Sequence, residues 1–217
     1  MGLAPSEAVP AGDWAALTQA FPRLWQGVRW ENEYKETFWR LTVDGVPLLG
    51  NSHLRGARAV PCRCGFVPAA GCASPRLHHF WFCPVAQAVL QQLESRIADS
   101  VTRVHVWLVQ APPGVTQCVW DVVSLATVSA MERGRRHLVT RRRQGQSDEE
   151  ILAGAVLCAV ADFWASLRHF ALLGVPRRGW TQVGALHPFL RVVEGRLVCA
   201  GPASELVGPG VLPADDE

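Results

Sequence analysis

The segment 61–87, PCRCGFVPAAGCASPRLHHFWFCPVAQ, constrains the fold more than any other part of this chain. It holds four of the seven cysteines and two of the seven histidines, interleaved with prolines and glycines. A segment rich in residues that break helices and strands cannot form an apolar core of its own. Its cysteines could form a disulfide staple, a catalytic thiol site, a metal site or part of an ordinary core.

The spacing of these residues favours a metal site. Cys62 and Cys64 are separated by one residue, and after thirteen further residues His78 and Cys83 are separated by four. Three sulfurs and one imidazole can form a tetrahedral site, and such soft ligands suit zinc. Cys83 directly precedes Pro84 at the expected start of a helix, where the helix dipole favours a thiolate. Cys72 and His79 are reserve ligands.

The other interpretations of the cysteines are less well supported. In an ordinary core, cysteines would act as small apolar side chains beside the aromatic run 80–82. A catalytic thiol needs an orienting group that the sequence does not identify. The N-terminus lacks the features of a secretory signal, so we expect an intracellular protein, and an odd cysteine count argues against a disulfide framework there. The longest apolar run, 151–161, is too short to span a bilayer, so no membrane is expected.

Apolar periodicity and capping residues predict a mainly α-helical fold with an embedded, small, irregular zinc-knuckle module and one short β-hairpin. Helices are expected at 14–21 with Asp13 as N-cap, at 30–43 with an aromatic face, from Pro84 to about 97, at about 116–143, and at 148–173 behind a capping box of Ser147 and Glu150. Segment 101–110 is the best strand candidate, although a strand and a buried helix are not separable at this length. A hairpin is expected about Glu194 and Gly195.

This pattern divides the chain into four predicted parts. Residues 1–60 form an N-terminal helical lead and linker, and 61–100 form the zinc-knuckle module with its following helix. Residues 101–200 form a helical C-terminal domain, and 201–217 form a flexible tail rich in proline and acidic residues.

The segment ERGRRHLVTRRRQ is the most basic part of the chain. Its six arginines are Arg133, Arg135, Arg136, Arg141, Arg142 and Arg143. Two or three cations at the end of a helix would complement its dipole. Six indicate an anionic partner, for which RNA or single-stranded DNA is the expected class. A solvated helix end and a nuclear-import signal are the alternatives.

The string CRCG…LHHFWFCPVAQAVLQQL resembles the zinc-binding segment that follows the polymerase domain of LINE-type (non-LTR) retrotransposon reverse transcriptases. Upstream, ETFWRLTVDGVPLLGNSHLRG is similar to the helix and linker before that segment. Downstream, VWDVVSLATVSAMERGRRHL resembles a helical extension found in some such elements, especially those of green algae. The resemblance covers about residues 35–143.

The resemblance implies that Cys62, Cys64, His78 and Cys83 bind zinc. The family usually separates its first two cysteines by two residues, whereas only Arg63 lies between them here. This departure leaves Cys72 as the alternative to Cys62.

Catalytic carboxylates are not recognisable in the sequence, so we expect a protein that is not an enzyme. Reverse transcription needs paired carboxylates that hold two metal ions. The adjacent Asp215 and Asp216 lie next to the C-terminus and are typical of an acidic tail. Glu33 and Lys35 have the spacing of a nuclease motif but lie in an expected helix without a convincing partner aspartate.

The function expected from these observations is non-catalytic binding of zinc and nucleic acid by a fragment of a LINE-type reverse transcriptase. Binding of RNA or single-stranded DNA should be weak and tolerant of sequence, and a polymerase domain is a second expected partner. The alternatives are a zinc-stapled helical module for protein interaction and a retrotransposon relic without function. The expected location is intracellular, with a nuclear location if the arginines serve import.

Overall fold

Helices make up most of the structure, a computed structural model that describes residues 11–42, 62–65, 75–97, 99–140, 145–173, 180, 183 and 187–202. The α-helices are α1 (Ala11–Pro22), α2 (Asn32–Thr42), α3 (Pro75–Leu77), α4 (Pro84–Glu94), α5 (Arg103–Trp107), α6 (Gln117–Thr140) and α7 (Asp148–Leu172). Two π-helical turns, η1 (Arg23–Gly27) and η3 (His78–Phe82), and the strands β1 (Leu190–Val193) and β2 (Arg196–Cys199) complete the described elements. The predicted mainly α class with one hairpin is confirmed.

Helix α6 is the centre of the fold. Every residue from 119 to 132 is buried. The helix is therefore enclosed on all sides, and its polar residues need partners inside the protein. The Thr127 hydroxyl, for example, donates to the Val123 carbonyl oxygen at 2.8 Å.

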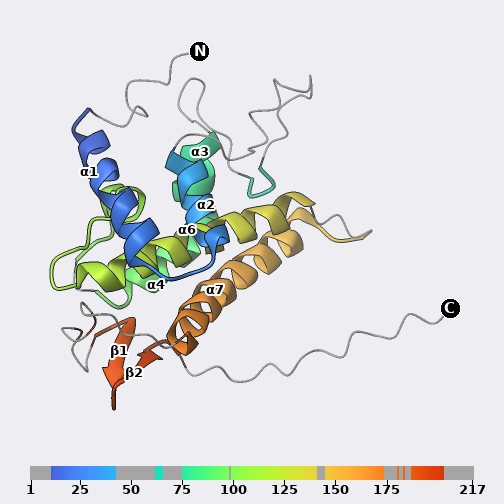
Figure 1. Ribbon diagram of the computed structural model, residues 1–217. Helices are drawn as coiled ribbons and strands as arrows, with labels where there is room; N and C mark the ends of the chain where they lie inside the picture. Colours follow the sequence, from blue (N-terminus) through green and yellow to red (C-terminus); the bar gives the residue numbers. More distant parts are fainter. Residues whose placement is uncertain are drawn as a thin grey trace.

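Two layers of helices enclose α6. In Figure 1, α1 and α2 lie on one side of α6 and α7 lies on the other, while α4 contacts both α6 and α7. Helices α6 and α7 are antiparallel, since Gly134 of α6 lies against Ala155 and Ala159 of α7 while Gly154 of α7 faces His137 of α6. The absence of a side chain at Gly134 allows α4, α6 and α7 to approach closely.

Local sequence signals account for several helix boundaries. Ser147 and Glu150 form the predicted capping box, in which the Glu150 N–H donates to Ser147 Oγ at 3.2 Å and the Ser147 N–H donates to Glu150 Oε2 at 2.8 Å. Pro84 occupies the first turn of α4, as predicted, where its missing N–H has no cost. Along α4, Val85 and Val89 are buried.

Three expectations about local structure are wrong. The strand candidate 101–110 instead contains the short helix α5, capped by Thr102, whose N–H donates to His105 Nδ1 at 3.1 Å. Its apolar residues do not alternate strictly with polar ones, and the capping contact favours a helix over a strand. Asp13 is the third residue of α1 and not its N-cap. The helical spacing of 30–43 also assigns Trp39 to the aromatic face of α2, but Trp39 is exposed at 45% and does not belong to the buried face.

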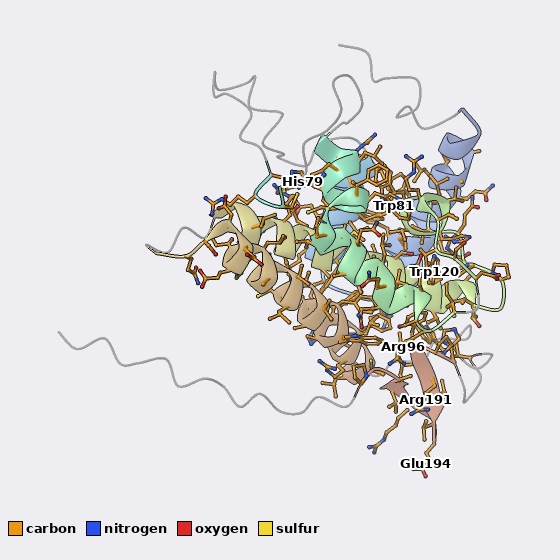
Figure 2. All side chains as sticks on the ribbon, turned by 180° about the vertical axis from the view of Figure 1, so that it is seen from behind. His79, Trp81, Arg96, Trp120, Arg191 and Glu194 are labelled. Carbon is orange, nitrogen blue, oxygen red and sulfur yellow. The ribbon has the colours of Figure 1, made fainter. Side chains whose placement is uncertain are left out.

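The hairpin has the predicted turn. Glu194 and Gly195 both adopt positive φ angles, 51° and 75°, which matches a two-residue turn between antiparallel strands. Arg96, just beyond α4, donates from Nη1 to the carbonyl oxygens of Pro188 at 3.2 Å and Ala200 at 2.8 Å. These bonds attach the base of the hairpin to the helices, while Glu194 lies at its far tip (Figure 2).

Helix α7 is, by length and composition alone, long and apolar enough to cross a membrane. The core helix of a soluble protein passes the same test, so this is weak evidence for a span. A stripe of its side chains, including Ala155, Ala159 and Phe163, is buried against other helices. One side of α7 therefore packs against the rest of the protein, while other apolar residues, such as Leu157, are exposed.

One hydrophobic core joins the described elements. Its members come from α1, α2, α4, α6, α7 and β1. The domain boundaries predicted at residues 60 and 100 therefore do not divide this core, and the boundaries themselves stay a prediction. The tail expected at 201–217 lies outside the described residues from 203 onward.

Candidate metal centre

A single π-helical turn brings His78 and Cys83 together. These residues are five apart, and the Cys83 N–H donates to the His78 carbonyl oxygen at 2.7 Å, the hydrogen bond that defines a π turn. Both side chains therefore lie next to each other at the start of α4. Cys62 and Cys64 come from a separate turn that ends at Gly65, whose φ of 74° favours glycine.

The four predicted ligands converge in space. The Sγ atoms of Cys62, Cys64 and Cys83 and a ring nitrogen of His78 all lie within 4.8 Å of one another. Cys64 Sγ is 3.3 Å from His78 Nε2. A tetrahedral zinc ion, with bonds of about 2.3 Å to sulfur and about 2.0 Å to nitrogen, places its ligand atoms about 3.5–3.8 Å apart. The cluster could hold a metal ion after a contraction of about 1 Å at its widest.

The thiol of Cys62 is held in its neutral form by its surroundings in the cluster. A hydrogen bond with Cys83, followed by burial, raises the pKa of the Cys62 thiol to about 12. Metal ligation requires the thiolate, and a bound cation reverses this electrostatic balance. Metal uptake at this cluster would therefore release protons and would strengthen with rising pH.

Contacts outside the four ligands connect the cluster to the helical core. Arg63, between the first two cysteines, lies 3.9 Å from Asp148 at the start of α7. Arg76 is buried, donates to the Leu41 carbonyl oxygen of α2 at 3.1 Å, and stacks over the Trp107 ring. The segment that carries the ligands is thus attached to α2, α5 and α7.

The core-cysteine interpretation holds for part of the cluster. Cys83 is buried within the hydrophobic core, whereas Cys62 and Cys64 are half-buried and pack against it. Burial accounts for Cys83 as an apolar side chain but not for the imidazole that faces Cys64. The convergence of all four residues is better explained by a shared ligand.

The two reserve ligands have different outcomes. His79 is buried beside His78, with ring centroids 4.9 Å apart, but it is not one of the four converging residues. Burial, followed by the charge of His78, lowers the pKa of His79 to about 3, so its ring is neutral. His79 and Trp81 both belong to η3, and Figure 2 shows them on opposite sides of it. Cys72 lies outside the described residues.

The arginine segment is only partly available to a partner. Arg135 is 5% exposed, and its Nε and Nη2 donate to the Glu132 carboxylate at 2.6 and 2.7 Å. Arg135 was predicted to contact nucleic acid. Its burial corrects that prediction, because a side chain enclosed in this way cannot also contact a phosphate. Arg136 donates to the same carboxylate at 2.9 Å but is exposed. Arg141, Arg142 and Arg143 lie outside the described residues.

Arg133 is also engaged within the protein. It forms an ion pair with Glu33 of α2, lies 3.8 Å from Asp162 of α7, and sits over the Tyr34 ring at 5.5 Å. Its side chain links α2, α6 and α7. Sequence reasoning missed the carboxylates that hold these arginines. The one signal in the sequence was the spacing of three and four residues from Glu132 to Arg135 and Arg136, which is typical of ion pairs within a helix.

The candidate catalytic carboxylates do not assemble into a site among the described residues. Glu33 is exposed and pairs with Arg133, whereas Lys35 is buried, so the two side chains lie in different environments. Asp215 and Asp216 fall outside the described part of the chain. Within that part, the Cys/His cluster is the one group of three or more potential metal ligands found.

No family model, curated protein or solved structure matches the chain. The resemblance to LINE-type reverse transcriptases therefore stays a prediction.

Proposed function

We propose that this chain is a zinc-stabilised, non-catalytic helical module that binds RNA or single-stranded DNA, derived from a LINE-type reverse transcriptase. The observation that carries the proposal is the convergence of Cys62, Cys64, His78 and Cys83 within 4.8 Å. Three thiols and one imidazole, without a carboxylate, form a donor set that favours zinc over magnesium or calcium.

A structural role for the metal follows from the number of ligands. Four protein ligands complete a tetrahedral shell, whereas catalytic zinc sites keep one position for water or substrate. Cys83 is almost fully buried, which further limits access to the ion. Zinc in this cluster would join the turn at 62–65 to the start of α4 and contribute directly to folding free energy.

The proposed nucleic-acid surface lies at the C-terminal end of α6. Arg136 is exposed there, and the sequence continues into Arg141, Arg142 and Arg143. This end of α6 is close to the metal centre, because Gly134 of α6 lies against Val85, which is two residues from Cys83. Phosphate contacts by these exposed or following arginines would give weak binding that is tolerant of sequence.

One observation favours the rival proposal, a module for protein interaction. The indole rings of Trp25 and Trp39 are exposed at 42% and 45%, and both stack edge-on against Phe21, at 5.5 and 5.1 Å. Exposed tryptophans in contact with a third aromatic ring are typical of surfaces that bind another protein. Such a surface would bind with little dependence on salt.

Metal analysis of the purified protein tests the zinc centre. We expect one zinc ion per chain, lost in Cys64→Ser and in His78→Ala. Cys158→Ser is the matched control, since Cys158 is an exposed cysteine on α7 outside the cluster. A metal-free native protein, or equal zinc content in all variants, would refute the proposal. Zinc retained in Cys62→Ser but lost in Cys72→Ser would move the first ligand to Cys72.

Titration of labelled RNA at several salt concentrations tests the nucleic-acid surface. Each phosphate contact to a single strand contributes a slope of about 0.7 log units of affinity per log unit of salt. Replacing Arg141, Arg142 and Arg143 with Ala should therefore reduce the slope by about two units. Arg103→Ala, at an exposed position on α5, is the control and should leave the slope unchanged. Equal slopes in the triple variant would rule out this surface and favour the interaction module.

A further inference from the structure

A second site lies at the other end of α6 and α7 from the metal centre. It is a pocket of about 480 Å³, within the range of about 300–1,000 Å³ that is typical of small-molecule sites. Its walls are apolar and aromatic, with Val28, Phe170, Leu173, Trp180 and Leu197 among them. The Phe170 and Trp180 rings are tilted by 37°, with centroids 5.7 Å apart.

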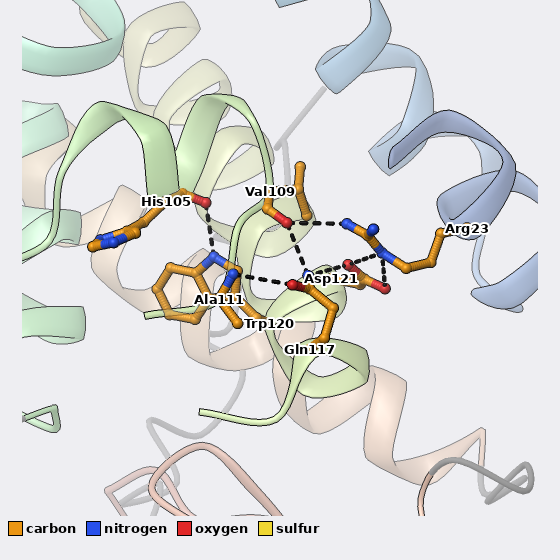
Figure 3. A network of polar contacts seen from close by, with 7 residues as sticks. All are labelled: Arg23, His105, Val109, Ala111, Gln117, Trp120 and Asp121. Atoms are coloured by element: carbon orange, nitrogen blue, oxygen red, sulfur yellow. Dashed lines mark hydrogen bonds and ion pairs between the residues drawn. The ribbon is translucent and has the colours of Figure 1, made fainter. Parts of the chain in front are cut away.

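The floor of the pocket is a polar network around the buried carboxylate of Asp121. Arg23 donates from Nε to both oxygens of Asp121 at 2.8 Å and from Nη2 to the Val109 carbonyl oxygen at 3.0 Å. Gln117 donates to the same two acceptors, Val109 O and Asp121 Oδ1, each at 2.8 Å, and accepts from the Ala111 N–H at 3.1 Å. Figure 3 shows how Arg23 and Gln117 reach these groups from opposite sides.

This network stores backbone strain. Val109 is a buried β-branched residue with a φ of 53°, a conformation that such residues rarely adopt. The two hydrogen bonds to its carbonyl oxygen hold it there. Burial raises the pKa of the Asp121 carboxyl, an effect opposed by Arg23 and Gln117. Strained backbone and a buried, paired charge at the floor of a pocket are features that cluster at binding sites.

The network keeps unused hydrogen-bonding capacity. Arg23 is 35% exposed, and its Nη1 makes no hydrogen bond with another described residue. Asp121 Oδ2 and Gln117 Oε1 each retain a lone pair beyond the bonds they accept. A donor therefore lies next to two acceptors, the pattern that reads the edge of a nucleobase.

The rim of the pocket favours an anion. Arg29 is exposed, lines the pocket, and has no ion pair or hydrogen bond with another described residue. Among the lining residues, two arginines, Arg23 and Arg29, outnumber the single carboxylate of Asp121, so the net charge is +1. A guanidinium at the mouth of an aromatic pocket suits a phosphate group on a bound ring system.

We propose that this pocket binds a nucleotide, with its base between the aromatic walls and the polar floor and its phosphate at Arg29. The occupant is either a free nucleoside monophosphate or the terminal nucleotide of an RNA strand. The pocket is separate from the metal centre, which lies near the other end of α6. Asp121 at the pocket and Arg135 at that other end are about 21 Å apart along the helix.

Isothermal titration of the full, zinc-loaded chain with AMP, GMP, CMP and UMP tests the site. We expect saturable binding of at least one nucleotide. Gly27→Leu should weaken it at least tenfold, because Gly27 lines the pocket and a Cβ placed there meets only Arg23 Cγ, at 3.9 Å. The added side chain can thus fill the pocket without displacing backbone. Melting temperature and zinc content identify a variant that is misfolded.

Arg29→Ala supplies a second and independent readout. It should weaken the nucleotide about tenfold but leave the corresponding nucleoside unchanged, whereas Arg103→Ala should affect neither. Competition between AMP and a short RNA, lost in Gly27→Leu, would identify the RNA terminus as the source. AMP binding without competition would identify free nucleotide. Absence of binding by all four nucleotides, or unchanged binding in a folded Gly27→Leu, would overturn the proposal while leaving the zinc and arginine tests unaffected.

Discussion

Replacing Gly134 with alanine should destabilise the protein, although alanine is the better helix former. Gly134 lies in α6 where α4 and α7 approach. A Cβ at this position would lie 2.5 Å from Val85 Cγ1, 2.8 Å from Ala159 Cβ and 3.1 Å from the Ala155 carbonyl oxygen. None of these atoms is the end of a flexible side chain, so relief requires movement of α4 or α7.

The magnitude follows from two opposing contributions. In a helix interior, Gly→Ala contributes about 1 kcal/mol of stability. Forcing a methyl group into a filled core costs about 1–3 kcal/mol, and two contacts below 3.0 Å place Gly134 at the upper end of this range. The expected net loss is about 2 kcal/mol. Val85 is two residues from Cys83, so displacement of α4 should also weaken metal binding.

Urea unfolding of the zinc-loaded protein measures this loss as a lower midpoint at an unchanged slope. Gly154→Ala is the matched control, because Gly154 lies in the facing helix and its added Cβ would meet only the His137 ring, at 3.2 Å. That control should keep or raise stability. A coupling of about 1 kcal/mol between Val85→Ala and Gly134→Ala would identify the contact. Stability in Gly134→Ala equal to or above that of the native protein would refute the reasoning.

Three further perturbations test other parts of the structure. Glu132→Ala leaves Arg135 buried without its carboxylate and should cost about 3–5 kcal/mol in urea unfolding; a loss below 1 kcal/mol would contradict the buried pair. Ser147→Ala removes the N-cap of α7 and should cost about 1 kcal/mol by the same assay, and no loss would contradict the cap. Burial lowers the pKa of His187 to about 4. Because the unfolded chain takes up this proton near pH 6.5, stability should fall as pH drops from 6.5 to 4, and an unchanged slope in His187→Phe would argue against this origin.

The sequence predicted those contacts of the metal centre that form between residues close together in the chain. His78 and Cys83 are joined by one turn of backbone, so their spacing alone predicted that they share a site. Their convergence with Cys62 and Cys64 required the chain to return across a stretch of thirteen residues, and the cysteine spacing only indicated it. The pocket at the N-terminal end of α6 had no sequence signal. Arg23 and Asp121, which form its floor, are 98 residues apart.

Features that depend on nearby residues could be predicted from the amino-acid sequence: the capping box of α7, the proline at the start of α4 and the turn of the hairpin. These depend on backbone hydrogen bonds and side-chain periodicity within a few residues. Which charged side chains are buried depends on the tertiary structure. Arg135 has the same sequence signature as the exposed Arg136, yet it lies inside because α6 is enclosed by other helices and Glu132 offers it a carboxylate there. Burial depends on contacts between distant segments, and local residue patterns do not encode them.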